Sequence, residues 1–285
     1  IREVRDRGLG DKCIGVEEAS FFSTVAEYKG VIAALKDATV VDGSGIVEEA
    51  RVVKSDEEIA LMRICSDILD QGTQAGIDAV RSGDSEDQIA ATVHEVLVRL
   101  GSEYPSLPNF VCSGPRASVT HATWQGRTVE KGDVVFFELS AVKHRYNVAI
   151  LRCVCDGEPG DEVRKFAEAS EAALAAAMGT IKPGVTCDAV YWATHNAIVE
   201  RGLGEYHPHR AGYSIGVSFP PDWGEGQILS LRNQEMRLLE PNMCFHIIPA
   251  IQRYREIGVC LSHTIRVTET GCEPFSKIPP KLIVK

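Results

Sequence analysis

A repeat within the chain places the strongest constraint on what it can fold into. Residues 81–94 align with residues 182–195 without a gap. The matched pairs are Gly83 with Gly184, Ser85 with Thr186, Asp87 with Asp188, His94 with His195 and, further on, Gly101 with Gly202. Matches of such unlike residue types in one register predict an internal duplication. The alternative is a chance similarity between two capped helices, because Ser and Thr are both ordinary N-cap residues.

Each copy is predicted to begin with a pair of helices. Ser55-Asp-Glu-Glu58 is a capping box for a long helix to about residue 80, and Ser85-x-x-Gln88 starts a second helix that ends near Gly101. In the second copy, an Ala-rich helix over about 161–179 matches the first helix. Strand-rich segments follow both pairs. We therefore expect an α+β domain, with two pseudo-twofold-related helix–helix–strand halves around a curved antiparallel sheet and a site between them.

The residues before the repeat are predicted to form a separate, smaller structural unit. Residues 12–16 and 39–41 have strand patterns, and residues 19–36 have a helical pattern between them. Three elements bury little surface. We expect residues 1–53 to be the C-terminal remnant of an N-terminal α/β domain plus a linker, and 54–285 to be the catalytic domain. The start at Ile1, without an initiator Met or a signal peptide, indicates a trimmed chain.

Composition excludes several classes of partner. The chain has 285 residues and a formal net charge of -10, which predicts binding to neither nucleic acid nor an anionic membrane and suits a cationic substrate. No run of about 18 apolar residues occurs, so no membrane span is expected. The nine cysteines include no Cys-x-x-Cys pair. They predict reduced thiols and a cytoplasmic protein.

An acidic residue directly follows an apolar run in the segment 132–154. Val134 to Phe137 predicts a strand with Glu138 at its inner end, and residues 146–154 predict its neighbour. An acid in this place is either an edge residue that faces water or a buried charge. Buried charges are costly without partners, so the second case predicts a functional site.

Histidines are the other candidates for chemistry. His121 ends a turn-rich loop just before the central strands, and the ordinary pKa of histidine, about 6.5, suits proton transfer at neutral pH. A loop histidine is also a common surface residue. His246 and His263 lie in apolar strand patterns, either as core residues or as a cluster with His121. His207-x-His209 is a weak candidate for a metal site, since no carboxylate accompanies the pair. The helical His94 and His195 are expected to be packing or surface residues.

These pieces, in this order, resemble the pita-bread superfamily of methionine aminopeptidase, prolidase, creatinase and ectoine hydrolase over about residues 54–276. The motifs that carry the resemblance are His121 with Lys131-Gly-Asp133, the Glu138…Tyr146…Arg152 strand pair, Gly212-Tyr-Ser-Ile-Gly216, Leu239-Glu-Pro-Asn-Met243 and Val267-Thr-Glu-Thr-Gly271. The resemblance implies a homodimer that acts on a small molecule.

The metal positions of that superfamily differ here. Its metal-dependent members hold two ions with Asp, Asp, His, Glu and Glu, and the resemblance places these at Glu138, Ala149, Tyr213, Ile248 and Ser262. One carboxylate cannot hold two metal ions. The chain therefore resembles the metal-free branch, with no cofactor, and its Tyr213-Ser-Ile-Gly and Phe219-Pro-Pro-Asp-Trp segments are most similar to ectoine-hydrolase-like proteins. Creatinase differs at Tyr213, Ile248 and Leu151, so creatine is not the expected substrate.

The expected activity is hydrolysis of a C–N bond in a small cationic or zwitterionic nitrogen compound. His121 would act as general base and then acid, while Glu138 would pair with a substrate cation or act as nucleophile. The remaining substrate-binding candidates are Tyr146, Tyr213, His246 and His263 for orientation, Arg210 or Arg152 for a carboxylate, and Asp222, Trp223 and Glu225 for the mouth. Two alternatives stay open: a prolidase-like metallopeptidase with altered ligands, and a non-catalytic binding protein on the same scaffold.

Overall fold

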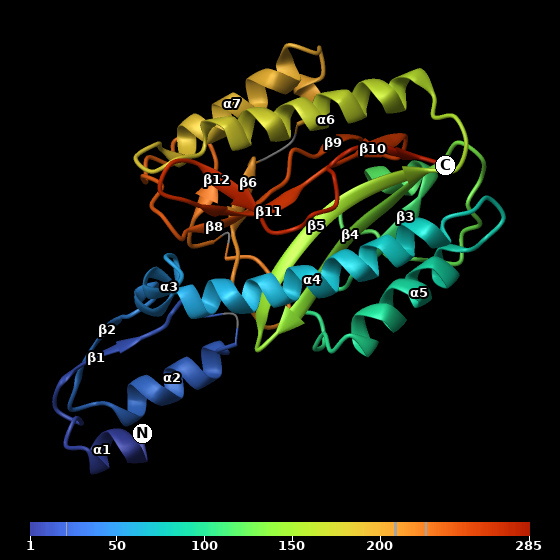
Figure 1. The fold of residues 1–285 in the computed structure, drawn as a ribbon. Coiled ribbons are helices and arrows are strands. Elements are labelled where there is room, and N and C mark those ends of the chain that lie inside the picture. The colour runs from blue at the N-terminus through green and yellow to red at the C-terminus, as the bar shows by residue number, and fades with distance from the viewer. Residues whose placement is uncertain (21, 208–209, 226) are drawn as a thin grey trace. The chain divides into compact units, whose positions relative to one another are not determined.

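The structure is a computed structural model that describes residues 1–20, 22–207, 210–225 and 227–285 (Figure 1). The chain divides into two compact units, Ile1–Arg51 and Val52–Lys285. No helix among the described residues is long and apolar enough to cross a membrane.

The first unit is small and built around two parallel strands. It contains α1 (Arg2–Asp6), β1 (Cys13–Val16), α2 (Val25–Ala34), β2 (Thr39–Asp42) and α3 (Ile46–Arg51), with β1 and β2 paired in parallel. The predicted helix from residue 19 begins later, because Thr24 and Glu27 form a capping box at the start of α2. The segment predicted as a linker holds the short helix α3.

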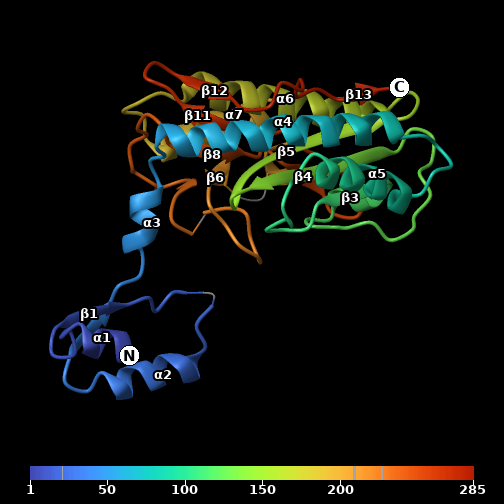
Figure 2. The ribbon, with the colours of Figure 1, turned by 60° about the horizontal axis from the view of Figure 1, so that its bottom comes forward.

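Two helix pairs enclose the strands of the second unit (Figures 1 and 2). They are α4 (Asp56–Ala79) with α5 (Glu86–Arg99), and α6 (Asp161–Thr180) with α7 (Cys187–Val199). Ser55 and Ser85 form the predicted capping boxes, and Thr186 accepts a hydrogen bond from the backbone N–H of Ala189. The helices lie where the sequence places them because these caps satisfy backbone groups that would otherwise lack partners.

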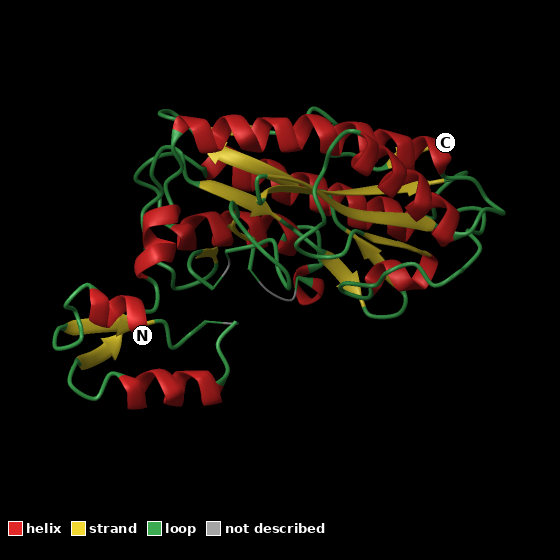
Figure 3. Ribbon diagram, turned by 90° about the horizontal axis from the view of Figure 1, so that it is seen from below, coloured by secondary structure: helices red, strands yellow, loops and turns green. Residues whose placement is uncertain are grey.

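The strands between the helix pairs form two main sheets (Figure 3). One has the order β13-β5-β4-β3 and the other β12-β11-β8-β6-β7. The strands of the first are β3 (Phe110–Ser113), β4 (Val134–Lys143), β5 (Tyr146–Cys155) and β13 (Ile283–Val284). Those of the second are β6 (Gly212–Ser214), β7 (Ser230–Leu231), β8 (Cys244–Ile247), β11 (His263–Val267) and β12 (Cys272–Pro274). A separate ribbon pairs β9 (Ile251–Arg253) with β10 (Ile257–Val259), and short 3₁₀ turns lie at Gly114–Ser118 and Gly204–Tyr206. All pairs in the two main sheets are antiparallel except β13 with β5.

Side-chain hydroxyls join the two sheets beside β5. The backbone N–H of Leu151 donates to Ser262 Oγ at 2.6 Å. Thr264 Oγ1 accepts from the backbone N–H of Ala149 at 3.1 Å and donates to its carbonyl at 2.7 Å. These bonds satisfy backbone groups where the ladder of β5 has no partner strand.

The predicted duplication is confirmed by equivalent contacts in the two halves. Gly83 N–H donates to the carbonyl of Val129 and Gly184 N–H to that of Leu239, both at 2.9 Å. The two glycines have φ of 100° and 82°, which a residue with a side chain rarely adopts. The two helices of each pair are therefore joined by the same kind of turn, and the equivalent bridges Ser85–Thr128 and Thr186–Leu238 follow it.

The strand β4 continues beyond the predicted boundary at Glu138. It runs to Lys143 and turns through His144 and Arg145, whose φ values of 47° and 64° suit a two-residue hairpin. Glu138 therefore lies in mid-strand rather than at its inner end. Because side chains alternate along a strand, Phe137 packs towards the core that includes α4, while Phe136 and Glu138 face the opposite side.

Candidate active site

A cavity of about 690 Å³ lies on that opposite side of β4. Its apolar walls include Leu107, Val119, Phe136, Leu151 and Ile248. Its ionisable lining includes His121, Glu138, Arg210, Tyr213 and Asp222, all candidates from the sequence. Both sequence copies supply lining residues, as expected for a site between two halves.

Glu138 brings a carboxyl group to this cavity. Among the described residues, no hydrogen bond or ion pair to its side chain is present. Burial, together with the nearby carboxylate of Asp222, raises its pKa to about 8. Glu138 consequently holds its proton at neutral pH until a positive group enters the cavity.

His121 faces the same cavity from the loop before β4. Its ring is stacked on Phe110, with the ring centroids 4.8 Å apart and an interplanar angle of 9°. Its φ is 60°, in the left-handed region that few residues other than glycine adopt. Partial burial lowers its pKa, although the negative charge of Asp222 opposes this effect. A neutral imidazole with accessible nitrogens is competent to accept a proton.

Glu86, which the sequence analysis missed, fastens the loop that carries His121. This fully buried carboxylate accepts hydrogen bonds from Ser113 N at 2.7 Å, Ser113 Oγ at 2.8 Å and Gln125 N at 3.0 Å, and it pairs with Arg116. Its position in the first turn of α5 is ordinary for an acidic residue, so nothing in the sequence distinguished it. Only the fold brings both ends of the loop to one carboxylate.

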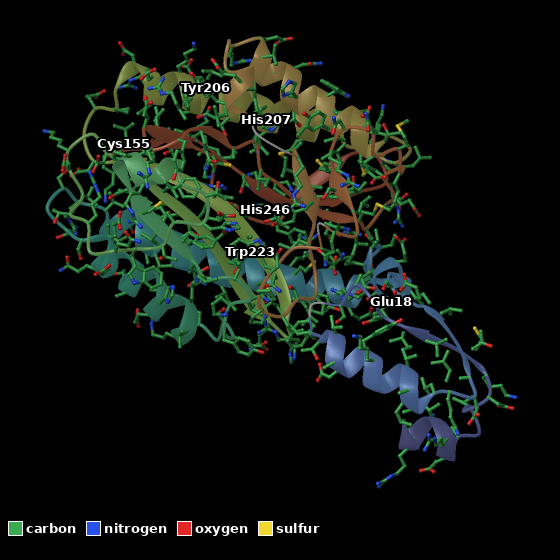
Figure 4. The ribbon with its side chains drawn as sticks, turned by 180° about the vertical axis from the view of Figure 1, so that it is seen from behind. Glu18, Cys155, Tyr206, His207, Trp223 and His246 are labelled. Carbon is green, nitrogen blue, oxygen red and sulfur yellow. The ribbon has the colours of Figure 1, made fainter. Side chains whose placement is uncertain are left out.

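Tyr213, Trp223 and His246 form a chain of hydrogen bonds beneath the cavity. Trp223 Nε1 donates to the Tyr213 hydroxyl at 2.7 Å, and that hydroxyl lies 2.9 Å from His246 Nδ1. His246 Nε2 is 2.8 Å from Ser262 Oγ. Burial lowers the pKa of His246 to about 3, so its ring is neutral. Trp223 and His246 lie in the interior of the unit (Figure 4), and of the four side chains Tyr213 alone lines the cavity.

The two arginine candidates differ in their surroundings. The Arg210 guanidinium lies 4.5 Å above the ring of Tyr213 and donates to Ser230 Oγ at 3.1 Å, while the side chain lines the cavity. Arg152 is fully buried and donates to the backbone carbonyls of Leu151, Ser262 and Ile278. Of the two, Arg210 is therefore the one placed to meet a substrate carboxylate.

Several other candidates lie away from the cavity. Tyr146 donates its hydroxyl to Glu58 Oε1 at 2.7 Å. Glu225 forms a buried ion pair with Lys54 at 2.9 Å, so it does not line the mouth. His263 is buried in β11, and burial lowers its pKa to about 3. Tyr146 and Glu225 therefore bond to other side chains of the protein, and His263 lies enclosed in the core.

The histidine pair proposed for a metal is described only in part. His209 lies outside the described residues. His207 Nδ1 is 3.1 Å from Nδ1 of His195, the helical histidine expected to be a packing or surface residue. His94, which matches His195 in the first copy of the repeat, packs edge-on against Trp124, with ring centroids 5.3 Å apart.

Comparison with known proteins identifies the family. The model of metallopeptidase family M24 matches residues 60–269, and the chain belongs to this family. An uncharacterized hydrolase/peptidase of Sinorhizobium fredii, y4tL, is 35% identical over 255 residues, which are 88% of this chain and 63% of that protein. The ectoine hydrolase of Halomonas elongata is 28% identical over 98% of this chain and 72% of its own length. The present chain thus spans less than two thirds of the length of y4tL.

Solved structures of relatives confirm the pita-bread fold. An X-Pro aminopeptidase from Thermotoga maritima superimposes with a TM-score of 0.90 at 26% identity, over 100% of this chain and 77% of that one. A Xaa-Pro dipeptidase from Bacillus anthracis gives the same TM-score and coverage at 28% identity. Identity to these peptidases and to ectoine hydrolase is similar, so overall similarity does not separate the two activities.

The described residues do not fit the metal centre that the family name implies. Within the described ranges, no group of three or more His, Cys, Asp or Glu side chains is arranged to hold an ion. Tyr213 and Ser262, at two of the expected ligand positions, are instead hydrogen-bonded to His246. Glu138 alone offers a carboxylate among those five positions, and two closely spaced cations need several.

Proposed function

We propose that the protein is a hydrolase that cleaves a C–N bond, other than a peptide bond, in a small cationic or zwitterionic nitrogen compound, without a metal ion. The observation that carries this proposal is the carboxyl group of Glu138, which has no partner among the described residues and faces a cavity shared with His121 and Arg210. A buried acid without a protein partner is suited to a partner supplied by the ligand.

Charge complementarity suggests the class of substrate. A protonated amidine or guanidine that enters the cavity would lower the pKa of Glu138, release its proton and form a charge-assisted pair. Arg210 would meet a carboxylate of the same molecule. The apolar walls would contact the carbon skeleton between these two charges.

His121 would perform the proton transfers. Its neutral imidazole takes a proton from water as the water oxygen attacks the electrophilic carbon, and it then gives that proton to the leaving nitrogen as the C–N bond breaks. The sum is the addition of one water across the bond. Partial burial, which lowers the pKa of His121, favours this basic form.

A second candidate is Xaa-Pro peptidase activity, which the similarity to Xaa-Pro dipeptidases favours. Its substrates are also zwitterions and would meet the same charges in the cavity. The two candidates differ in the bond cleaved and in their need for metal.

A substrate screen separates the candidates. Purified protein is incubated with ectoine, guanidino acids and Xaa-Pro dipeptides, with and without a chelator, and products are measured by mass spectrometry. We expect turnover of a non-peptide compound that the chelator does not change. Chelator-sensitive cleavage of Xaa-Pro dipeptides would overturn the proposal in favour of a metallopeptidase, and binding without turnover would establish a non-catalytic protein.

A further inference from the structure

The hydroxyl of Tyr213 has two hydrogen-bond neighbours in the protein, and the Tyr213 side chain lines the cavity. Trp223 Nε1 is a donor only, so the phenol oxygen accepts that bond. The contact with His246 Nδ1 can run in either direction, depending on which ring nitrogen carries the proton. The direction of this bond decides whether Tyr213 presents a proton or a lone pair to a ligand.

The hydrogen bonds at Ser262 distinguish the two possible tautomers of His246. If His246 carries its proton on Nε2, it donates to Ser262 Oγ, which already accepts from Leu151 N–H at 2.6 Å. The Ser262 hydroxyl proton then has no acceptor among the described residues, although the side chain is fully buried. A buried donor without an acceptor is rare and unfavourable.

If His246 carries its proton on Nδ1 instead, the Ser262 hydroxyl proton has an acceptor. Ser262 then donates to His246 Nε2, and His246 donates from Nδ1 to the Tyr213 oxygen. The protons on Ser262 Oγ, His246 Nδ1 and Trp223 Nε1 then each have an acceptor within 2.9 Å. The phenol proton of Tyr213 is the one left over, and it belongs to a side chain that lines the cavity, where a ligand can accept it.

We propose that Tyr213 is a fixed hydrogen-bond donor which, with Arg210, forms a subsite for a carboxylate or carbonyl oxygen of the ligand. His246 and Ser262 are positioning residues that act through Tyr213. The assignment of the ligand rests on the proposed function, whereas the direction of the hydrogen bonds does not.

The surroundings support a permanent donor. Burial and the nearby carboxyl of Glu138 raise the pKa of Tyr213 well above its ordinary value, so the hydroxyl keeps its proton. The low pKa of His246 keeps the imidazole neutral, with one proton to place. The Arg210 guanidinium stacks on the same phenol ring, so both donors are held in one geometry.

The first experiment reads the tautomer directly. Protein labelled with ¹⁵N-histidine is examined by NMR, and the His246 signals are assigned by their loss in His246→Gln. We expect a protonated Nδ1 and an unprotonated Nε2 that do not titrate between pH 5 and 8. A protonated Nε2 in the wild-type protein overturns the proposal, whatever the protein hydrolyses.

A pair of hydroxyl deletions tests the cause of this tautomer. Ser262→Ala removes the proposed donor to His246, and we expect the signals to shift towards the Nε2-protonated form. Thr264→Val is the matched control, because it removes another buried hydroxyl that joins β11 to β5 without a side-chain bond to His246. Equal shifts in both variants would assign the effect to the sheet junction and contradict the role of Ser262.

The second experiment tests the ligand class by calorimetry. The probes are 4-guanidinobutanoate and butylguanidine, which lacks the carboxylate. Tyr213→Phe is expected to weaken binding of the first about tenfold and to leave the second unchanged, as for the loss of one hydrogen bond. Unchanged binding of 4-guanidinobutanoate in Tyr213→Phe, or its failure to bind the wild type, overturns the subsite. Neither measurement requires turnover, so failure of the proposed activity is detected separately.

Discussion

The two halves of the repeat share a scaffold but supply opposite kinds of side chain to the cavity. The first half provides Glu138, which has no partner among the described residues, and His121, which contacts the protein through ring stacking. The second half provides Tyr213, which is held by Trp223 and His246. Burial acts on both halves. It raises the pKa of Glu138 to about 8 and lowers that of His246 to about 3.

This difference separates groups suited to reaction from groups suited to orientation. A titratable side chain without a protein partner is ready to exchange a proton with a ligand, whereas one with all its hydrogen bonds made stays in one state. Four experiments, which use five substitutions and their controls, test this division and the equivalence of the two halves.

The largest expected effect is on turnover at His121. His121→Asn should lower kcat by about 10²- to 10⁴-fold, since general-base catalysis contributes about that much. Asn tolerates the positive φ at this position. His144→Asn is the matched control, because His144 also has a positive φ, of 47°, but is exposed in the β4–β5 turn. Comparable losses in both variants would contradict the catalytic role of His121.

A substitution at Glu86 tests how the loop that carries His121 is held in place. Glu86→Gln should destabilise the fold by about 3–5 kcal/mol, since the variant leaves Arg116 and two backbone N–H groups without a carboxylate. Urea unfolding measures this loss. The neighbouring Asp87→Asn is the control, because Asp87 is exposed and accepts a single hydrogen bond among the described residues, from Gly126 N–H. A loss below 1 kcal/mol in Glu86→Gln would show that the loop is held by other contacts.

Glu138 tests the link between burial and pH. The folded-state pKa, about 8, lies above the ordinary value of 4.5, so the unfolded chain loses this proton first. The contribution of Glu138 is therefore fully present below pH 4.5 and is lost as the pH rises to about 8, at up to about 1.4 kcal/mol per pH unit. Relative to wild type, Glu138→Gln should gain stability across this window, as measured by unfolding at several pH values without ligand. A constant difference would show that burial does not raise this pKa.

The smallest effect tests the equivalence of the halves. Asp87 accepts from Gly126 N–H at 2.9 Å, and its repeat partner Asp188 accepts from Gln234 N–H at 2.7 Å. Asp87→Asn and Asp188→Asn should each cost about 1 kcal/mol, since each weakens one hydrogen bond to a turn. Clearly unequal losses in urea unfolding would break the equivalence.

Much of the fold was predictable because its signals are local. Capping residues, the repeat and the apolar strand pattern fixed the four long helices and the central hairpin. The errors were also local in origin. The charge of Glu138 suggested a strand end, yet the cavity accommodates that carboxyl in mid-strand, and the linker before Lys54 contains the turn of helix α3.

The structure brings some of the candidate residues together and leaves others apart. His121, Glu138, Arg210, Tyr213 and Asp222 line one cavity. Trp223, His246 and Glu225 have the same kind of motif membership but make their bonds inside the core. A motif names residue types in order, and it carries no information on which way each side chain faces or which partner it finds.

By itself, the sequence determined the duplication, the approximate positions of the four long helices and the small number of carboxylates at the expected metal positions, because these depend on residue identity and short-range pattern. Only the tertiary structure decided that Glu138 has no partner among the described residues while His246 is bonded at both ring nitrogens. It also brought both ends of the His121 loop to Glu86. Burial and hydrogen bonding depend on contacts between residues far apart in the chain, and these contacts exist only once the two halves enclose the cavity.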